Sequence, residues 1–279
     1  MELKSKENVR FGQAVFSPNS DEIIYATGYE FTSDGRILGL KGCYNRPSGI
    51  WRLTFPQQLD QLRMSDLSEK LNPAAVIEMV LQKLTPASLS CRSPRTFGRH
   101  GGSTLAWLAC PTGGAHLGAS ALYYLDISLD LNTSVLLKTT DTPLVPITKD
   151  EIPSSPLDFP GLYPYNLLAS PGIVTVSEVS SIVIHSQWGS RTTVLLISTK
   201  DGKVTDLTPV KEGLDSWTVL ATDGQSRVVC LRSSTSVPYE ILLGDFDDIG
   251  RVSWHLIDKP DLPEYSKSSN SISIVTSDC

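Results

Sequence analysis

Residues 173–208 read IVTVSEVSSIVIHSQWGSRTTVLLISTKDGKVTDLT, and this stretch decides the fold class of the chain. Short runs of β-branched and aliphatic residues alternate in it with polar ones, which is typical of strands. The expected strands are Ile173 to Ser177, Ser181 to Ser186, Thr192 to Ser198 and Lys203 to Leu207. The Asp201-Gly202 dipeptide before the last run is typical of a hairpin turn. The stretch therefore predicts one antiparallel unit of four strands.

The same order of strands and turns recurs along the rest of the chain. One unit begins at Gln13 and reaches Leu53, another runs from Ser93 to Asp126, and a third from Trp217 to Leu243. Repeated four-stranded meanders are the sequence signature of a β-propeller, whose sheets are buried only when they stack on one another. A β-sandwich is the alternative on strand pattern alone. The recurring turn and loop lengths favour an all-β partial propeller of about four four-stranded blades over residues 1–258.

Two segments do not follow this repeat. Residues 56–89 mix apolar and polar side chains, and we treat them as an insertion between two units. A short helix is expected over Met64 to Lys70, and Pro73 could sit in the first turn of a second short helix. Equally, Val76 to Leu84 could be an outer strand. Residues 259–279 are rich in serine, and we expect a loosely held tail there.

Composition excludes several classes of partner. The 279 residues are 40% hydrophobic and carry a formal net charge of −6, without a basic run, so nucleic acid is not an expected partner. The alternating charges of residues 1–7 do not form a signal peptide. Apolar runs such as Val194 to Ile197 are too short to cross a membrane. We therefore expect a soluble, cytoplasmic protein that contacts no membrane and keeps its five cysteines reduced.

No catalytic serine is evident. A serine hydrolase of the α/β class needs a G-x-S-x-G nucleophile elbow, and the sequence contains none. The nearest matches, Gly101 to Leu105 and Gly118 to Leu122, have leucine in place of the second glycine. We expect Ser103, in the first of these, to be a turn residue.

The candidate metal ligands and acid–base groups are four histidines and two acidic pairs. His100 and His116 lie in glycine-rich loops with Cys91 and Cys110 nearby in sequence, but no metal-ligand spacing occurs. His185 is expected at the end of a strand. The remaining candidates are His255, in an alternating strand, and the acidic pairs Asp247-Asp248 and Asp150-Glu151, in turns without an evident partner. We predict no catalytic residue, no metal ligand and no cofactor site in the chain.

Several motifs resemble those of a known family. GQAVFSPNSD, from Gly12 to Asp21, resembles a blade start in acylaminoacyl peptidases of the prolyl oligopeptidase class, and CYNRPSGIW, from Cys43 to Trp51, resembles a segment before one of their blade strands. Gly161 to Tyr163, Ser216 to Leu220 and Ser234 to Pro238 fit in the same order. The similarity runs from about Gly12 to Ile257. Gly98 to Gly102 departs from the family's turn pattern, and the 56–89 segment is longer than in typical members.

This resemblance implies a two-part protein. In the family, a seven-bladed propeller covers a C-terminal α/β-hydrolase domain, whose Ser-Asp-His triad removes N-acylated amino acids from short blocked peptides. The chain would be the propeller portion, which gates access, and its partner would be a hydrolase domain that lies outside it. A homo-oligomer is compatible with this assignment. Since we expect no triad in the chain, the resemblance implies that enzymatic activity belongs to the longer protein, which would be a serine-type peptidase.

Other interpretations remain open at this point. The rival from another class is a stand-alone propeller that serves as an interaction scaffold without catalysis. A relative of dipeptidyl peptidases or prolyl oligopeptidases would share the architecture. A G-x-S-x-G elbow encoded in frame after Cys279 would decide for a peptidase.

Overall fold

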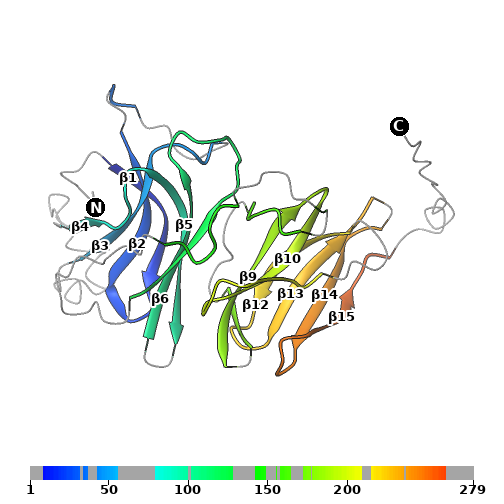
Figure 1. Ribbon diagram of the computed structural model, residues 1–279. Helices are drawn as coiled ribbons and strands as arrows, with labels where there is room; N and C mark the ends of the chain where they lie inside the picture. Colours follow the sequence, from blue (N-terminus) through cyan, green and yellow to red (C-terminus); the bar gives the residue numbers. More distant parts are fainter. Residues whose placement is uncertain are drawn as a thin grey trace, which may run out of the picture. The chain divides into compact units, whose positions relative to one another are not determined.

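The computed structural model describes residues 9–31, 34–36, 43–55, 79–99, 102–127, 142–148, 155, 158–164, 172–176, 178–208, 215–235 and 237–261. In these residues all regular elements are antiparallel strands, and no helix occurs among them. The chain divides into two compact units between Ser170 and Pro171. Each unit contains two sheets (Figure 1).

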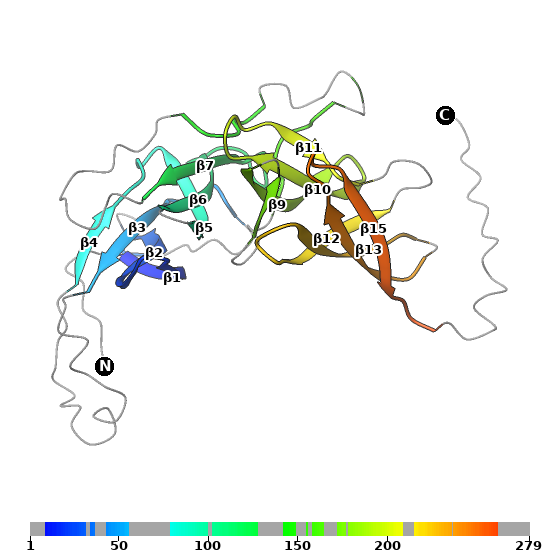
Figure 2. The same ribbon diagram turned by 90° about the horizontal axis from the view of Figure 1, so that it is seen from below.

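The N-terminal unit contains the first two sheets. Strands of the first sheet, in the order β1-β2-β3-β4, are β1 (Val9–Ser17), β2 (Ser20–Glu30), β3 (Ser48–Thr54) and β4 (Val80–Lys83). Strands of the second, in the order β5-β6-β7, are β5 (Leu89–Arg99), β6 (Gly102–Pro111) and β7 (Ala121–Asp126). Two isolated bridges, Ser120 to Leu162 and Leu122 to Val145, continue this second sheet next to β7. Figure 2 shows β1 to β4 following one another across the first sheet.

The C-terminal unit contains the other two sheets. Strands of the third sheet, in the order β11-β10-β9-β8, are β8 (Ile173–Val176), β9 (Val179–Trp188), β10 (Arg191–Ser198) and β11 (Val204–Asp206). Strands of the fourth, in the order β12-β13-β14-β15, are β12 (Ser216–Thr222), β13 (Arg227–Ser233), β14 (Glu240–Phe246) and β15 (Val252–Asp258). Every neighbour in these sheets is also the neighbour in sequence, so each sheet is a simple meander.

The all-β prediction is confirmed, and the four predicted units correspond to the four successive meanders. The choice left open for Val76 to Leu84 is resolved for Val80–Lys83, which form a strand and pair with β3 through Leu81 and Leu53. The expected helix at residues 64–70 and most of the expected tail lie outside the described residues.

The third and fourth sheets pack together through aromatic side chains. Strand β12 contacts β9 and β10. The rings of Trp217 in β12 and Trp254 in β15 lie 4.8 Å apart, and Trp254 Nε1 donates to the carbonyl oxygen of Leu207 at 3.2 Å. Gly244 makes room for this arrangement, because a Cβ there would lie 2.8 Å from both the Trp254 indole and the Val252 side chain. Both rings belong to the fourth sheet, and the hydrogen bond from the Trp254 indole to Leu207, directly after β11, joins it to the third sheet.

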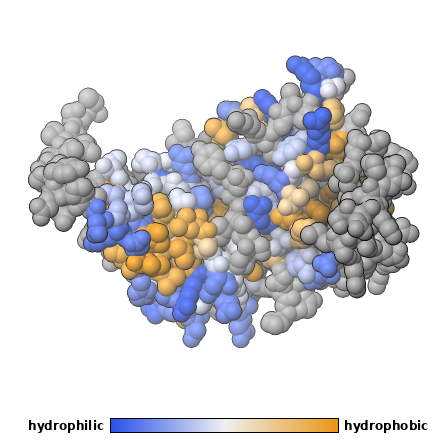
Figure 3. Space-filling view, turned by 180° about the vertical axis from the view of Figure 1, so that it is seen from behind, coloured by the Kyte–Doolittle hydropathy of each residue, from blue (hydrophilic) through white to orange (hydrophobic). Residues whose placement is uncertain are grey.

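The surface of the C-terminal unit carries exposed apolar side chains. Figure 3 shows apolar side chains gathered on the face of this unit that is turned to the viewer. Large apolar residues exposed in the unit are Leu220, Val237, Tyr239, Ile249, Leu256 and Ile257. Leu256 and Ile257 belong to β15, the edge strand of the fourth sheet, and are 50% and 56% exposed. Exposed apolar patches of this kind mark surfaces that associate with other protein.

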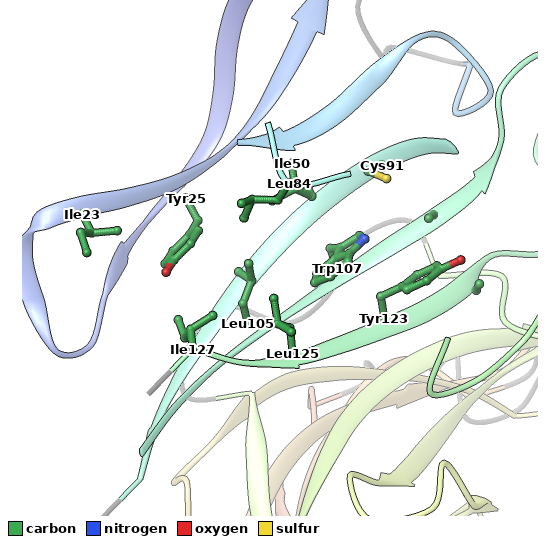
Figure 4. Close-up of a cluster of buried hydrophobic side chains, with 12 residues drawn as sticks. Ile23, Tyr25, Ile50, Leu84, Cys91, Leu105, Trp107, Tyr123, Leu125 and Ile127 are labelled. Atoms are coloured by element: carbon green, nitrogen blue, oxygen red, sulfur yellow. The ribbon is translucent and has the colours of Figure 1, made fainter. Parts of the chain in front are cut away.

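A continuous core joins the first two sheets. Ile23, Tyr25 and Ile50 of the first sheet pack with Leu105 and Trp107 of the second (Figure 4). Both aromatic residues are 1% exposed. These contacts bury one face of each sheet, which is how successive blades of a propeller stabilise one another.

Two β-bulges, one in each of these two sheets, are linked by a hydrogen bond between a backbone N–H and a side chain. Gln13 in β1 and Ser93 in β5 both have positive φ, 51° and 57°, and each lies within an irregularity of strand pairing. The side chain of Gln13 accepts hydrogen bonds at Oε1 from Ser93 N at 2.8 Å and from Thr27 Oγ1 at 2.9 Å. The bulge residues are therefore held against each other by one amide side chain.

Candidate functional site

The best-connected polar site of the described chain surrounds the turn that precedes β3. Asn45 in this turn donates from Nδ2 to the carbonyl oxygen of Gly114 at 2.6 Å, and Gly113 N donates to the carbonyl oxygen of Asn45 at 2.7 Å. The carbonyl oxygen of Tyr44 accepts from Cys110 Sγ at 3.1 Å and from the Ser90 hydroxyl. These bonds dock the turn of the first sheet onto the second sheet and onto the loop after β6.

A buried arginine lies beneath this turn. Arg92 in β5 is 2% exposed, and its guanidinium carbon lies 4.0 Å from the centre of the Tyr44 ring. The Arg92 Nη2 group donates to Ser120 Oγ at 2.9 Å and to the carbonyl oxygen of Pro164 at 3.0 Å. Burial lowers the pKa of this guanidinium. The cation is compensated by an aromatic face and by neutral oxygens, which suits a structural role.

A thiol and an imidazole meet at the outer edge of the same turn. The sulfur of Cys43 lies 3.3 Å from Nδ1 of His116, although 73 positions separate the two residues in sequence. Cys43 is half-buried and His116 is exposed. This is the one part of the candidate site where a nucleophilic side chain and a base are in contact at the surface of the described chain.

The residues considered as metal ligands in the sequence lie apart from one another or are buried. Cys91 and Cys110 are on the adjacent strands β5 and β6, and both are buried. Burial raises the pKa of Cys91 to about 12 and also raises that of Cys110, so both thiols stay protonated near neutral pH. His116 contacts Cys43, and His100 lies outside the described residues. No group of three or more metal-ligating residues occurs in the part of the chain that the structure describes.

The serines of the two near-elbow sequences are buried in the second sheet. The expected turn position of Ser103 is wrong, since Ser103 lies in β6, 1% exposed and opposite Gly98. Ser120 bridges to Leu162 and accepts the hydrogen bond from Arg92. Neither hydroxyl is presented on a strand-to-helix turn, which is what a nucleophile elbow requires.

The other titratable candidates are placed as follows. His185 was expected at a strand end, but it lies inside β9, opposite Val194, and burial lowers its pKa. His255 does alternate in β15, and its Nε2 lies 3.7 Å from an Asp245 oxygen at an exposed position. Asp247 closes a turn as expected, with its carboxylate 2.9 Å from Arg251 Nε. Asp150 and Glu151 lie outside the described residues. None of these groups converges with another on a shared site among the described residues.

Sequence reasoning did not identify the Cys43–His116 contact. The sequence shows a motif from Cys43 to Arg46 and a glycine-rich loop around His116, but nothing in it pairs the two. The glycines of this loop are the feature of the sequence that could have indicated the contact, since Gly113 and Gly114 provide the backbone groups that bind Asn45.

The described residues include no helix with the length and apolar character of a membrane span.

The sequence of the chain matches one protein family. Residues 4–267 match the family described as "Acylamino-acid-releasing enzyme, N-terminal domain". An acylamino-acid-releasing enzyme of Arabidopsis thaliana is 30% identical over 255 residues, which cover 88% of this chain and 30% of that protein. Acylamino-acid-releasing enzyme 2 of Oryza sativa subsp. japonica is 30% identical over 246 residues, 84% of this chain and 30% of that protein.

Similar solved structures include prolyl oligopeptidase B from Galerina marginata, with a TM-score of 0.46 and 14% identity, covering 88% of this chain and 26% of that one. A family 117 glycoside hydrolase from Zobellia galactanivorans has a TM-score of 0.48 and 11% identity, covering 92% of this chain and 73% of that one. The chain spans 30% of the length of the two curated relatives described above.

Proposed function

The chain belongs to the family of N-terminal domains of acylamino-acid-releasing enzymes, and we propose that it is the non-catalytic propeller portion of such a peptidase. In the longer protein, a C-terminal α/β-hydrolase domain would carry the Ser-Asp-His triad and release N-acylated amino acids from short blocked peptides. This chain would cover that domain and restrict access to it. The observation that carries the proposal is the family match, which extends through all four sheets.

The arrangement of side chains supports a non-catalytic role. The sequence contains no G-x-S-x-G elbow, and the two serines that come nearest to one are buried in sheet contacts. The polar site around Tyr44 and Arg92 ties one sheet to the next and has neutral oxygens and a ring around its cation. We therefore propose that another domain supplies the chemistry on a blocked peptide.

The exposed apolar residues of the C-terminal unit support the presence of a partner. Leu256 and Ile257 are exposed on the edge strand of the fourth sheet, whereas natural sheets usually protect such an edge with charges or cover it. We propose that further parts of the longer polypeptide cover this edge. Residues 1–258 would then form the propeller portion and residues 259–279 would lead towards the hydrolase domain. A cytoplasmic location and a homo-oligomeric assembly belong to the same proposal.

The gating role can be tested on the full polypeptide that contains this chain. We would measure kcat/KM on N-acetylated peptides that share the same first residues and increase in length. The expected result is a marked fall in kcat/KM from short to long peptides, because a covering domain admits only small substrates. Equal or rising values for long peptides would contradict the gate. A full polypeptide that hydrolyses no blocked peptide would instead support the interaction scaffold.

A further inference from the structure

The thiol–imidazole contact between Cys43 and His116 is not used by the proposed function. The two side chains come from different loops, the turn before β3 and the loop between β6 and β7, and approach to 3.3 Å between Sγ and Nδ1. A neutral imidazole within this distance can accept the proton of a thiol. Since the thiolate is the form of cysteine that attacks, such a pair is suited to nucleophilic chemistry.

One side-chain and one backbone hydrogen bond of Asn45 hold both loops in place. Asn45, two residues after Cys43, exchanges hydrogen bonds of 2.6 and 2.7 Å with Gly114 and Gly113, which are two and three residues before His116. Leu117, directly after His116, has a φ of 54°, an uncommon conformation for a leucine. The thiol–imidazole approach is therefore maintained by the fold around it and does not depend only on its own weak contact.

The other described cysteines contrast with Cys43. Cys91, Cys110 and Cys230 are buried, and burial raises the pKa of all three thiols, to about 12 for Cys91 and Cys230. These three thiols have little contact with solvent and stay protonated near neutral pH. Among the four described cysteines, only Cys43 combines access to solvent with a neighbouring base.

We propose that Cys43 is a modification site for small disulfides of the glutathione class, and that His116 acts as the base. The imidazole accepts the thiol proton while Cys43 Sγ attacks one sulfur of R–S–S–R. The Cys43–sulfur bond forms, the R–S–S–R bond breaks, and the leaving thiolate takes the proton from the imidazolium. The small disulfide is the only oxidant that this exchange needs. The inference concerns the surface of the N-terminal unit and does not rest on the proposed peptidase role.

The test uses the full 279-residue chain in a Cys279→Ser background, because Cys279 lies outside the described residues. The chain is incubated with oxidised glutathione at neutral pH, and adducts are located by peptide mass mapping. The expected result is one glutathionyl adduct at Cys43 and none at the buried cysteines. In His116→Ala, the rate of adduct formation at Cys43 should fall by about tenfold. Free imidazole should restore part of the lost rate in this variant and leave the wild-type rate nearly unchanged.

Two controls keep the result interpretable. Cys91 and Cys230 report folding, since they become modified only if the chain unfolds. Cys43→Ser should abolish the adduct. Equal rates in the wild type and in His116→Ala, with Cys91 and Cys230 protected in both, would overturn the role of His116. An absence of the Cys43 adduct in the folded wild type would overturn the site itself.

Discussion

Replacing Trp107 by alanine tests the claim that one core holds the first two sheets together. The side chain is 1% exposed and stacks on Tyr123, with ring centres 5.4 Å apart and planes 7° from parallel. An indole of this kind buries about 200 Å², which at about 25 cal/mol per Å² contributes about 5 kcal/mol. The methyl group of alanine retains about 1 kcal/mol of this. We expect Trp107→Ala to lower the free energy of unfolding by about 4 kcal/mol.

The assay is urea unfolding followed by far-UV circular dichroism. Trp107→Phe keeps part of the ring area and should cost about 1–2 kcal/mol. A double-mutant cycle with Tyr123→Ala should give a coupling energy of about 0.5–1.5 kcal/mol, because the rings are in offset contact. A cycle between Trp107 and Phe11, which packs against a different cluster, should be additive within about 0.5 kcal/mol. A loss below about 1 kcal/mol for Trp107→Ala would refute the shared core.

Three further predictions concern the C-terminal unit and the buried thiols. The isolated chain should self-associate in size-exclusion chromatography with light scattering, and the double variant Leu256→Lys with Ile257→Lys should be a monomer. As a control, Val80→Lys, at an exposed position of the other unit, should still self-associate. A sharp monomer peak for the unaltered chain would contradict this prediction. Gly244→Ala should lower the free energy of unfolding in urea by about 1–3 kcal/mol, because the new Cβ would lie 2.8 Å from the Trp254 side chain. An unchanged free energy of unfolding would show that the packing around Gly244 is loose. Burial raises the pKa of the Cys230 thiol from its usual 9.0 to about 12, so the thiol's contribution to the free energy of unfolding is complete below pH 9 and is lost as the pH rises towards 12. The free energy of unfolding should therefore fall less between about pH 8 and about pH 10.5 in Cys230→Ala than in the wild type. Identical falls would exclude the Cys230 thiol as a cause of the pH dependence.

The sheets were predictable wherever apolar runs alternate with strong turn signals. In the third sheet, the expected strand from Thr192 to Ser198 is β10 almost residue for residue, because an Asp-Gly turn follows it closely. Strand β9 was expected to end at Ser186 but continues to Trp188. Gln187 and Trp188 extend this hairpin by pairing with Thr192 and Arg191 of β10, and backbone pairing of this kind leaves no apolar pattern in the sequence.

Other elements depend on contacts between distant segments. Val80–Lys83 is a strand because β3 offers an open edge, which local periodicity cannot reveal. Ser103 was misplaced for the same reason, since β6 already pairs with β5 at Gly102. The Cys43–His116 contact requires two loops to be docked by Asn45, and nothing in the spacing of those residues indicates it. The predicted lack of a catalytic serine rests on the missing G-x-S-x-G motif and stays a prediction.

We propose that the chemistry lies in a hydrolase domain of a longer polypeptide, outside these 279 residues. The most direct measurement is to treat the full polypeptide with a fluorophosphonate probe and to map the labelled serine by mass spectrometry. We expect a single adduct on a serine of the hydrolase domain, and no labelling of the 279-residue chain on its own. An adduct on any serine of this chain, at Ser103 or Ser120 above all, would contradict the account.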